Sequence, residues 1–232
     1  MLATCRRVRT LVSVPRELGH SAPVVVQVVV LSGVRSLAPF AEATASSGGL
    51  ELAATHGWVQ LLPGLVGRGG HWTHEATRRA ALNNRPQVLE WGCVHFPVCW
   101  GSTRVATGAA EGGRLELLQW ARAQSPPAPW DARTCSTAAV GGHLDLLQWA
   151  RAQSPPAPWD ARTCEGAARG GHLALLQWSH VLGAPWDETT CSSAALGGHL
   201  GVLQWARAHG ALWGGTTCSS AALGGHLGVL QW

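Results

Sequence analysis

The most constraining feature of this chain is a stretch that occurs twice: Thr190–Trp205 returns letter for letter as Thr217–Trp232, 27 positions later. Each copy holds two alanines, then two glycines, then a histidine followed by apolar residues at helical spacing. Small alanines let two helices approach closely, and glycine adopts the left-handed conformation that ends a helix. The stretch therefore predicts a helix, a tight glycine turn and a second helix. Because one such hairpin cannot bury both of its apolar faces, we expect copies to stack on one another.

The alanine pair recurs along most of the chain at steps of 27 or 29 residues. The seven pairs begin at Ala53, Ala80, Ala109, Ala138, Ala167, Ala194 and Ala221. The longer steps place their two extra residues in proline-containing loops such as Gln124–Trp130, because proline cannot continue a helix. We expect an all-α solenoid over residues 48–232, built from about seven helix-turn-helix repeats of 27–29 residues, the last of them truncated.

Particular residues of the unit have expected structural roles. We expect Thr190 to cap the first helix with its hydroxyl and His199 to begin the second helix and bond the neighbouring backbone. In one unit Asn83-Asn84 take the place of the glycines and Arg85 takes the place of the histidine. Asparagine is the next best residue for a left-handed turn, so the turn is expected to persist.

The unit resembles an ankyrin repeat. The matching residues are Thr190, Ala194, Ala195, Gly198, His199, Val202, Leu203, Gly210 and Ala211. The family's proline and histidine after the threonine are Cys191 and Ser193 here, and the unit is about six residues shorter than the typical period of about 33. The resemblance is closest to the short, tryptophan-rich ankyrin arrays of algal and protist proteins, and it implies that a loop replaces the β-finger between repeats.

The resemblance implies a non-catalytic scaffold that holds a protein partner on its concave side. In ankyrin repeats the partner-facing positions lie at the end of the first helix and in the tips between repeats. Carried over, the helix-end positions are Val140, Arg169, Leu196 and Leu223, and the tips contribute Asp131, Arg133, Asp160, Arg162, Asp187 and Glu188. We expect a monomer without a cofactor.

Composition narrows the classes of function. All 17 basic side chains are arginine, so no lysine can form a Schiff base or serve as a general base. After residue 45 there are 12 arginines and 11 acidic residues. This nearly neutral part of the chain therefore lacks the dense positive face that binding of nucleic acid requires. The apolar run Val24–Leu31 is too short to span a bilayer. Residues 1–47 do not fit the repeat, and their arginines also suit an organelle transit peptide, the alternative to a cytoplasmic protein with a non-repeat leader.

Two other hypotheses remain open. Cys93, His95 and Cys99 cluster in one irregular loop and offer a zinc-binding or enzymatic alternative, although they lack a C-x2-C pair. The repeated Cys135, Cys164, Cys191 and Cys218 are expected in the core as free thiols, because successive copies lie too far apart to share one ion or a disulfide. No catalytic residue is expected, because every candidate serine and histidine is repeated in place. The near-identical units also suit a non-functional fragment produced by repeat expansion.

Tryptophan recurs at two positions of the unit. Those in the second helix are expected in the core, and they are Trp120, Trp149, Trp178, Trp205 and Trp232. Those in the connecting loops are Trp130, Trp159, Trp186 and Trp213. The loop tryptophans either fill the space left by the lost finger or stand exposed as binding anchors.

Overall fold

The computed structural model describes residues 47–232 of the chain. The predicted leader, its transit-peptide alternative and the run Val24–Leu31 therefore lie outside the described residues, apart from Ser47. Between residues 47 and 232 the chain forms helices and short connections, without a strand. This confirms the all-α, repeating architecture expected from the alanine pairs. Of the helices described, none combines the length and the hydropathy that crossing a membrane requires.

Each alanine pair lies in the first helix of a hairpin. These first helices are α2 (Ser47–His56), α4 (His74–Leu82), α7 (Arg104–Glu111), α9 (Ala132–Val140), α11 (Ala161–Gly170), α13 (Glu188–Leu196) and α15 (Thr216–Leu223). The second helices are α5 (Pro86–His95), α8 (Leu115–Ala123), α10 (Leu144–Arg151), α12 (Leu173–Val181), α14 (Leu200–Ala208) and α16 (Leu227–Gln231). In the first hairpin η2 (Val59–Leu61) and α3 (Leu62–Val66) take this place, and α6 (Pro97–Trp100) lies between α5 and α7.

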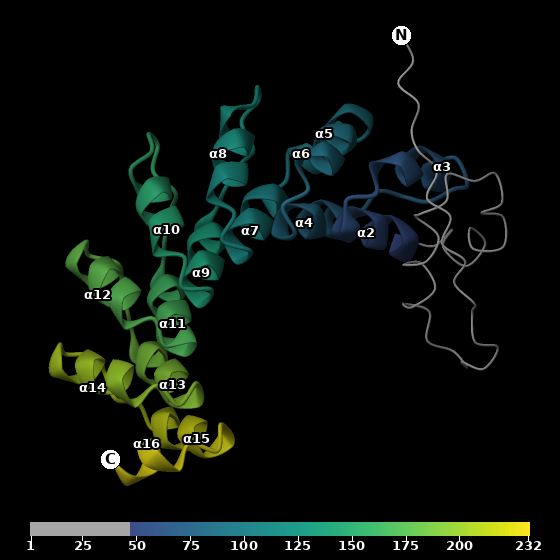
Figure 1. Ribbon diagram of the computed structural model, residues 1–232. Coiled ribbons are helices and arrows are strands. Elements are labelled where there is room, and N and C mark those ends of the chain that lie inside the picture. Colours follow the sequence, from purple (N-terminus) through teal and green to yellow (C-terminus); the bar gives the residue numbers. More distant parts are fainter. Residues whose placement is uncertain (1–46) are drawn as a thin grey trace, which may run out of the picture.

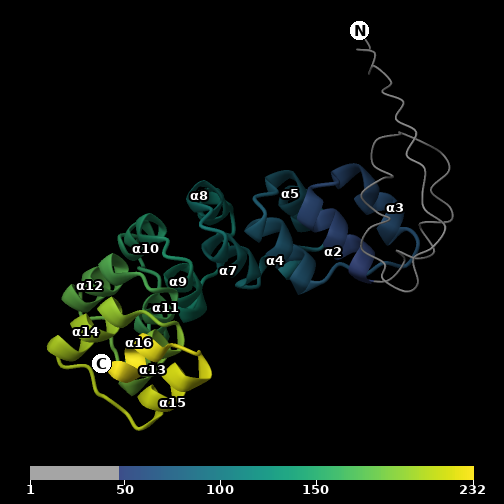
Figure 2. The same ribbon diagram turned by 60° about the horizontal axis from the view of Figure 1, so that its bottom comes forward.

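The first helices form one continuous curved row. Each of them packs against the first helix of the next hairpin, from α2 to α15. Figure 1 shows this row on the inside of the curve, with α8, α10, α12 and α14 spreading outward from it. In Figure 2 the helices keep the same order, and α2 and α15 lie at opposite ends of the array. Residues 47–232 therefore form an open, curved stack without a central globule.

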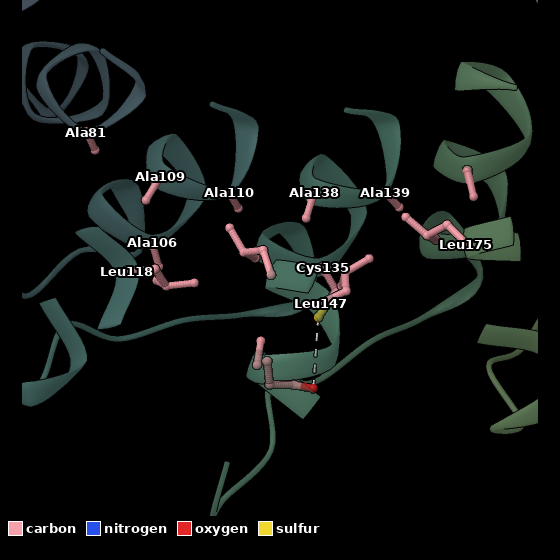
Figure 3. Close-up of a cluster of buried hydrophobic side chains, with 14 of the residues drawn as sticks. Ala81, Ala106, Ala109, Ala110, Leu118, Cys135, Ala138, Ala139, Leu147 and Leu175 are labelled. Atoms are coloured by element: carbon pink, nitrogen blue, oxygen red, sulfur yellow. Dashed lines mark hydrogen bonds between the residues drawn. The ribbon is translucent and has the colours of Figure 1, made fainter. Parts of the chain in front are cut away.

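Alanine pairs set the close spacing of the inner row. Ala109 and Ala110 are both fully buried in α7, and Figure 3 shows them on opposite sides of that helix. Ala110 lies toward Ala138 of α9, and Ala139 lies on the far side of α9. The first alanine of a pair therefore faces the preceding first helix, and the second faces the next. At Gly108 the helices α4 and α7 approach so closely that no side chain fits, because a Cβ there would lie 2.4 Å from the carbonyl oxygen of Arg78.

The prediction that Thr190 caps the first helix is wrong, because the N-cap lies three residues earlier. Asp187 is the N-cap of α13, and its side chain accepts the backbone N–H of Thr189 at 2.9 Å. Thr190 lies inside the first turn and is fully buried. In α9 the equivalent Thr134 completes a capping box by accepting the N–H of Asp131 at 3.4 Å. The helix starts earlier because a carboxylate in the connecting loop reaches the free N–H groups first.

The turn between the two helices follows the prediction. Gly198 has φ +74°, and the second glycine of the other Gly-Gly turns is also left-handed. Asn84, which replaces that glycine, has φ +54° and is the non-glycine residue with positive φ in the described part. The substitution therefore preserves the backbone conformation, as expected.

Candidate functional site

The candidate site is the side of the first helices that the array leaves open. Each first helix inside the row packs against two other first helices and its own second helix, so one side remains free. We call this surface the inner face, because Figure 1 places it inside the curve. In α9 it consists of Arg133, Ser136, Thr137 and Val140, which are exposed or half-buried and spaced by three or four residues. The equivalent positions of the other first helices extend it along the row.

The inner face between α2 and α7 carries charges that neutralise one another. Arg78 of α4 pairs with Glu75 at 2.7 Å and also with Glu111 of α7. Arg79 pairs with Glu75 at 2.9 Å and with Glu51 of α2 at 3.6 Å. Hydrogen bonds from Arg78 and Arg79 lower the pKa of Glu75 from 4.5 to about 2. This network links three hairpins and leaves little uncompensated charge on this half.

The half from α9 to α15 carries the predicted helix-end residues. Val140, Arg169, Leu196 and Leu223 hold equivalent places at the ends of successive first helices. The side chain of Val140 is 49% exposed and that of Leu223 is 83% exposed. Arg169 is also exposed, and Leu196 is half-buried. Apolar and cationic side chains therefore reach solvent at one repeating position.

The predicted tip residues lie at the other end of the same helices. Asp131, Asp160 and Asp187 are the N-caps of α9, α11 and α13. Their side chains accept backbone N–H groups two residues further on, at 2.9–3.1 Å. This capping explains the three aspartates without any partner. Arg162 pairs with Asp160 at 2.9 Å, whereas Arg133 and Glu188 are exposed.

The ten predicted residues thus form two rows, one at each end of these first helices. A first helix of nine residues separates them by about 12 Å, at 1.5 Å per residue. The surface between the rows carries hydroxyl groups that the sequence reasoning did not include. Ser136 and Thr137 of α9 and Ser192 of α13 are half-buried there. Their three- and four-residue spacing from the helix-end position is the signal that would have identified them.

A hydrogen bond at each glycine turn fixes the row of helix ends. His172 Nε2 lies 3.0 Å from the carbonyl oxygen of Val140 in the preceding hairpin. Because a carbonyl oxygen can only accept, Nε2 carries the proton. The ring packs between two glycines, since a Cβ on Gly142 or Gly170 would lie 2.5 Å from it. The same bond joins His143 to Glu111, His199 to Arg169, and His226 to Leu196 at 3.0–3.3 Å.

Arginine makes the equivalent bond where histidine is missing. Arg114 donates from Nε to the carbonyl oxygen of Leu82, and Arg85 donates to that of Thr55, both at 3.2 Å. The guanidinium of Arg85 lies beside Gly57, much as the histidine rings lie beside the glycines. All six junctions between the seven hairpins therefore carry a side-chain bond to a helix-end carbonyl. The sequence predicted this bond for histidine and missed it for arginine.

The tryptophans form pairs that bridge successive hairpins. Trp130 of the connecting loop meets Trp149 of the next second helix edge to face, with ring centroids 6.1 Å apart. The guanidinium of Arg122 lies over Trp130, 4.0 Å from its centroid. Arg151 covers Trp159 at the same distance. One repeat later His180 replaces the arginine and stacks on Trp186 with centroids 4.1 Å apart.

These contacts correct the expectation for the second-helix tryptophans. Trp120, Trp149, Trp178 and Trp205 are half-buried beside the core, and Trp232 is exposed. Fully buried leucines such as Leu146 and Leu147 fill the core in their place. The loop tryptophans Trp130, Trp159 and Trp186 are also half-buried, which favours the space-filling interpretation over exposed anchors. Trp213, at the end of the array, is 37% exposed.

The structure does not bring the suggested zinc ligands together. Cys93 and Cys99 line a small cavity of about 10 Å³, the lower limit for one water molecule, and His95 does not line it. The ring of His95 stacks on Trp91, and its Nδ1 lies 2.8 Å from the Trp91 carbonyl oxygen. Burial raises the pKa of Cys93 to about 12, which disfavours the thiolate that zinc requires. Within residues 47–232, no three His, Cys, Asp or Glu side chains are arranged to hold a metal ion.

Three of the four repeated cysteines are buried, as predicted. Cys135, Cys164 and Cys191 are 0% exposed and have free thiols. Cys135 points its thiol toward the carbonyl oxygen of Ala157, 4.0 Å away, as the dashed line in Figure 3 shows. Burial raises the pKa of Cys135 to about 11. Cys218 contradicts the prediction, because it is exposed on α15.

The comparisons with protein families and with curated proteins do not assign this chain to a family. No family model matches the chain, and no curated protein matches it.

Proposed function

We propose that this chain is an ankyrin-type repeat scaffold that binds a protein partner on its inner face and catalyses no reaction. The observation that carries the proposal is the row of Val140, Arg169, Leu196 and Leu223, side chains that reach solvent at one repeating position. The backbone carbonyls of the first three accept the histidine bonds. The first three positions of the row are therefore held rigidly, and the side chains of Val140, Arg169 and Leu223 are exposed.

Rigidity favours binding because little order has to be created when the partner arrives. The helix ends at Val140, Arg169 and Leu196 are each tied to the next hairpin, and the alanine pairs of α9, α11 and α13 are fully buried. A pre-organised surface avoids the entropy of ordering loops, which otherwise subtracts from affinity. Successive hairpins repeat the surface about every 10 Å, the packing distance of neighbouring helices. A partner can therefore contact several hairpins at once.

Three of the four repeated cysteines and the histidines of the glycine turns are engaged in packing. Cys135, Cys164 and Cys191 are buried and their pKa values are raised, so their thiols are poor nucleophiles. His143 and His172 use Nε2 to hold the neighbouring backbone. Cysteine and histidine recur at these positions in the next hairpin. This repetition supports a structural role.

The C-terminal part of the inner face is the better docking region. Between α2 and α7 the arginines are already paired with glutamates. Between α9 and α15 the surface offers exposed Val140, exposed Arg169 and serine hydroxyls. Arginine beside apolar side chains is typical of the residues that dominate binding energy at interfaces. The partner that fits has apolar side chains flanked by acidic groups.

A phage-displayed random peptide library, selected on the full chain, tests this proposal. Selected peptides should lose at least tenfold in affinity, about 1.4 kcal/mol, for a Val140→Ala/Arg169→Ala variant measured by fluorescence anisotropy. Gln148→Ala is the matched control, because Gln148 is exposed on α10, away from the inner face. Equal affinity for both variants would place the binding elsewhere. A selection without any enriched peptide would instead favour a non-functional product of repeat expansion.

A further inference from the structure

Two histidines meet where other hairpins carry different residues. His180 of α12 stands at the position that Arg151 holds in α10. His209, the C-cap of α14, stands at the position of Gln153. The ring centroids of His180 and His209 lie 6.2 Å apart, with the ring planes at 80°. We call these two residues the histidine pair. Figures 1 and 2 show α12 and α14 as neighbours, so the pair joins two successive hairpins.

The ring of His209 is held with one nitrogen prepared to accept. Its Nδ1 lies 2.8 Å from the carbonyl oxygen of Trp205. Because a carbonyl oxygen can only accept, Nδ1 carries the proton and Nε2 keeps its lone pair. The ring also stacks on Trp205, with centroids 4.2 Å apart. Histidines that ligate a metal commonly donate their other ring N–H to a backbone carbonyl in this way.

The ring of His180 is positioned by other rings. It stacks on Trp186 with centroids 4.1 Å apart and meets Trp205 edge to face at 5.6 Å. Within residues 47–232 its side chain makes no hydrogen bond, so its nitrogens are not committed to the backbone as those of the turn histidines are. His180 is half-buried and His209 is exposed, which leaves the pair open to water and to a small ion.

We infer that the histidine pair binds one divalent transition-metal ion that prefers nitrogen ligands. An imidazole nitrogen ligates such an ion at about 2.0–2.1 Å, so two rings on opposite sides of one ion have centroids about 6 Å apart. The observed separation of 6.2 Å fits this arrangement. Two opposed nitrogens with water at the remaining positions suit the tetragonal coordination of Cu²⁺ and Ni²⁺.

The surroundings of the histidine pair disfavour Mg²⁺ and Ca²⁺. Neither α12 nor α14 contains Asp or Glu, and the side chain of Asp187 in the loop between them accepts the N–H of Thr189. Mg²⁺ and Ca²⁺ require oxygen ligands, whereas imidazole suits Cu²⁺, Ni²⁺ and Zn²⁺, and Cu²⁺ binds most tightly of these. The second helices lie on the outer side of the curve, so the inner face stays open and the inference does not depend on partner binding.

Equilibrium dialysis of the full chain against a series of Ni²⁺ concentrations, followed by metal analysis, tests the inference. Ni²⁺ is the probe because, unlike Cu²⁺, it does not oxidise free thiols such as that of Cys218. The repeat supplies variants that keep the local packing. His180→Arg restores the arginine that Arg151 places over a tryptophan. His209→Gln restores the bond that Gln153 donates to the backbone of its own helix at 3.1 Å. Each variant should bind one Ni²⁺ fewer per chain than the unaltered protein.

His95→Gln is the matched control. His95 makes the same bond to the Trp91 carbonyl oxygen at 2.8 Å and the same stack on Trp91 at 4.3 Å. The ring contacts of the described residues pair His95 with no other histidine, so this variant should bind as much Ni²⁺ as the unaltered chain.

Melting temperatures give a second measurement. An ion that bridges two hairpins stabilises the folded array, so Ni²⁺ should raise the melting temperature of the unaltered chain and of His95→Gln. It should raise that of His180→Arg and His209→Gln less. The inference is overturned if both of these variants bind as much Ni²⁺ as the unaltered chain, or if His95→Gln loses an equal amount. Loss of the ion in only one of the two would indicate a site with a single histidine and would also overturn it.

Discussion

His172 donates a hydrogen bond from Nε2 to the backbone carbonyl oxygen of Val140, 3.0 Å away in the preceding hairpin. The bond satisfies a carbonyl at the end of α9 that has no partner within its own helix. It also ties the turn of one hairpin to the end of the first helix before it. Since Arg85 and Arg114 make the same bond elsewhere, the donor matters more than the ring.

Replacing His172 tests this conclusion. His172→Ala should lower the free energy of unfolding by about 1–3 kcal/mol, because it leaves the Val140 carbonyl without its partner. His172→Arg should recover part of the loss, since arginine already serves at two other junctions. Urea denaturation followed by circular dichroism measures both. Equal losses for the two variants would show that the hydrogen bond contributes little.

The glycines at the turn should tolerate no side chain. Gly142→Ala should destabilise the fold by more than about 1 kcal/mol, because φ is +73° and a Cβ would lie 2.5 Å from the His172 ring. Gly201→Ala is the opposite case, because this residue lies in α14, where an added Cβ would meet no atom within 4 Å. It should stabilise by about 0.4–1 kcal/mol. Chemical denaturation of the two variants gives the sign of each change in the free energy of unfolding. A stabilising Gly142→Ala would contradict the close packing of the His172 ring on Gly142.

Arginine over tryptophan should contribute to the junctions at the loops. Arg151 covers Trp159 and donates to the Ala157 carbonyl oxygen at 2.7 Å. Arg151→Ala should cost about 1–3 kcal/mol by losing both contacts. Arg162→Ala, which removes an exposed ion pair with Asp160, should cost less than about 1 kcal/mol. Thermal unfolding of Arg151→Ala and Arg162→Ala compares the two losses of stability. Equal losses would show that the Arg151 contacts contribute no more than an exposed ion pair.

The ion-pair network should make stability depend on pH in the acid range. The pKa of Glu75 is lowered to about 2, so its charge stabilises the fold above its ordinary value of 4.5, and this contribution disappears as the pH falls toward 2. About a third of the side chain is exposed, so we expect about 1 kcal/mol. Glu75→Gln should be destabilised by that amount at pH 7 and by almost nothing near pH 2. Glu116→Gln, at an exposed position of α8, should show no such trend in urea titrations at several pH values.

Much of the fold follows from the sequence because the repeat carries its own local signals. The alanine pairs located all seven first helices, and Asn84 was recognised as a left-handed turn residue. The histidine bond to neighbouring backbone was also predicted correctly. These features depend on one or two residues and their fixed spacing, so a single sequence is enough to identify them.

The errors arose where neighbouring hairpins decide the outcome. Thr190 looked like a cap, but Asp187 in the loop reaches the helix start first. Cys218 has the same local sequence as Cys191 yet is exposed, whereas Cys191 is buried on α13, which packs against α15. Arg85 was recognised at the position of the histidine, but the sequence did not indicate that Arg85 and Arg114 make the same inter-repeat bond. The proposed binding residues follow from the resemblance, and the structure shows only that several of them cap helices or reach solvent.

Deleting one repeat tests the central claim, that neighbouring hairpins of the described array stabilise one another along one elongated core. Removal of residues 190–216 joins Thr189 directly to Thr217, so the removed Thr190–Trp205 is replaced by the identical Thr217–Trp232 and the Asp187 cap is kept. Stacking predicts a shortened array with unchanged helix content per residue and a modestly lower melting temperature by circular dichroism. Loss of all helical signal in the deleted chain would contradict the account.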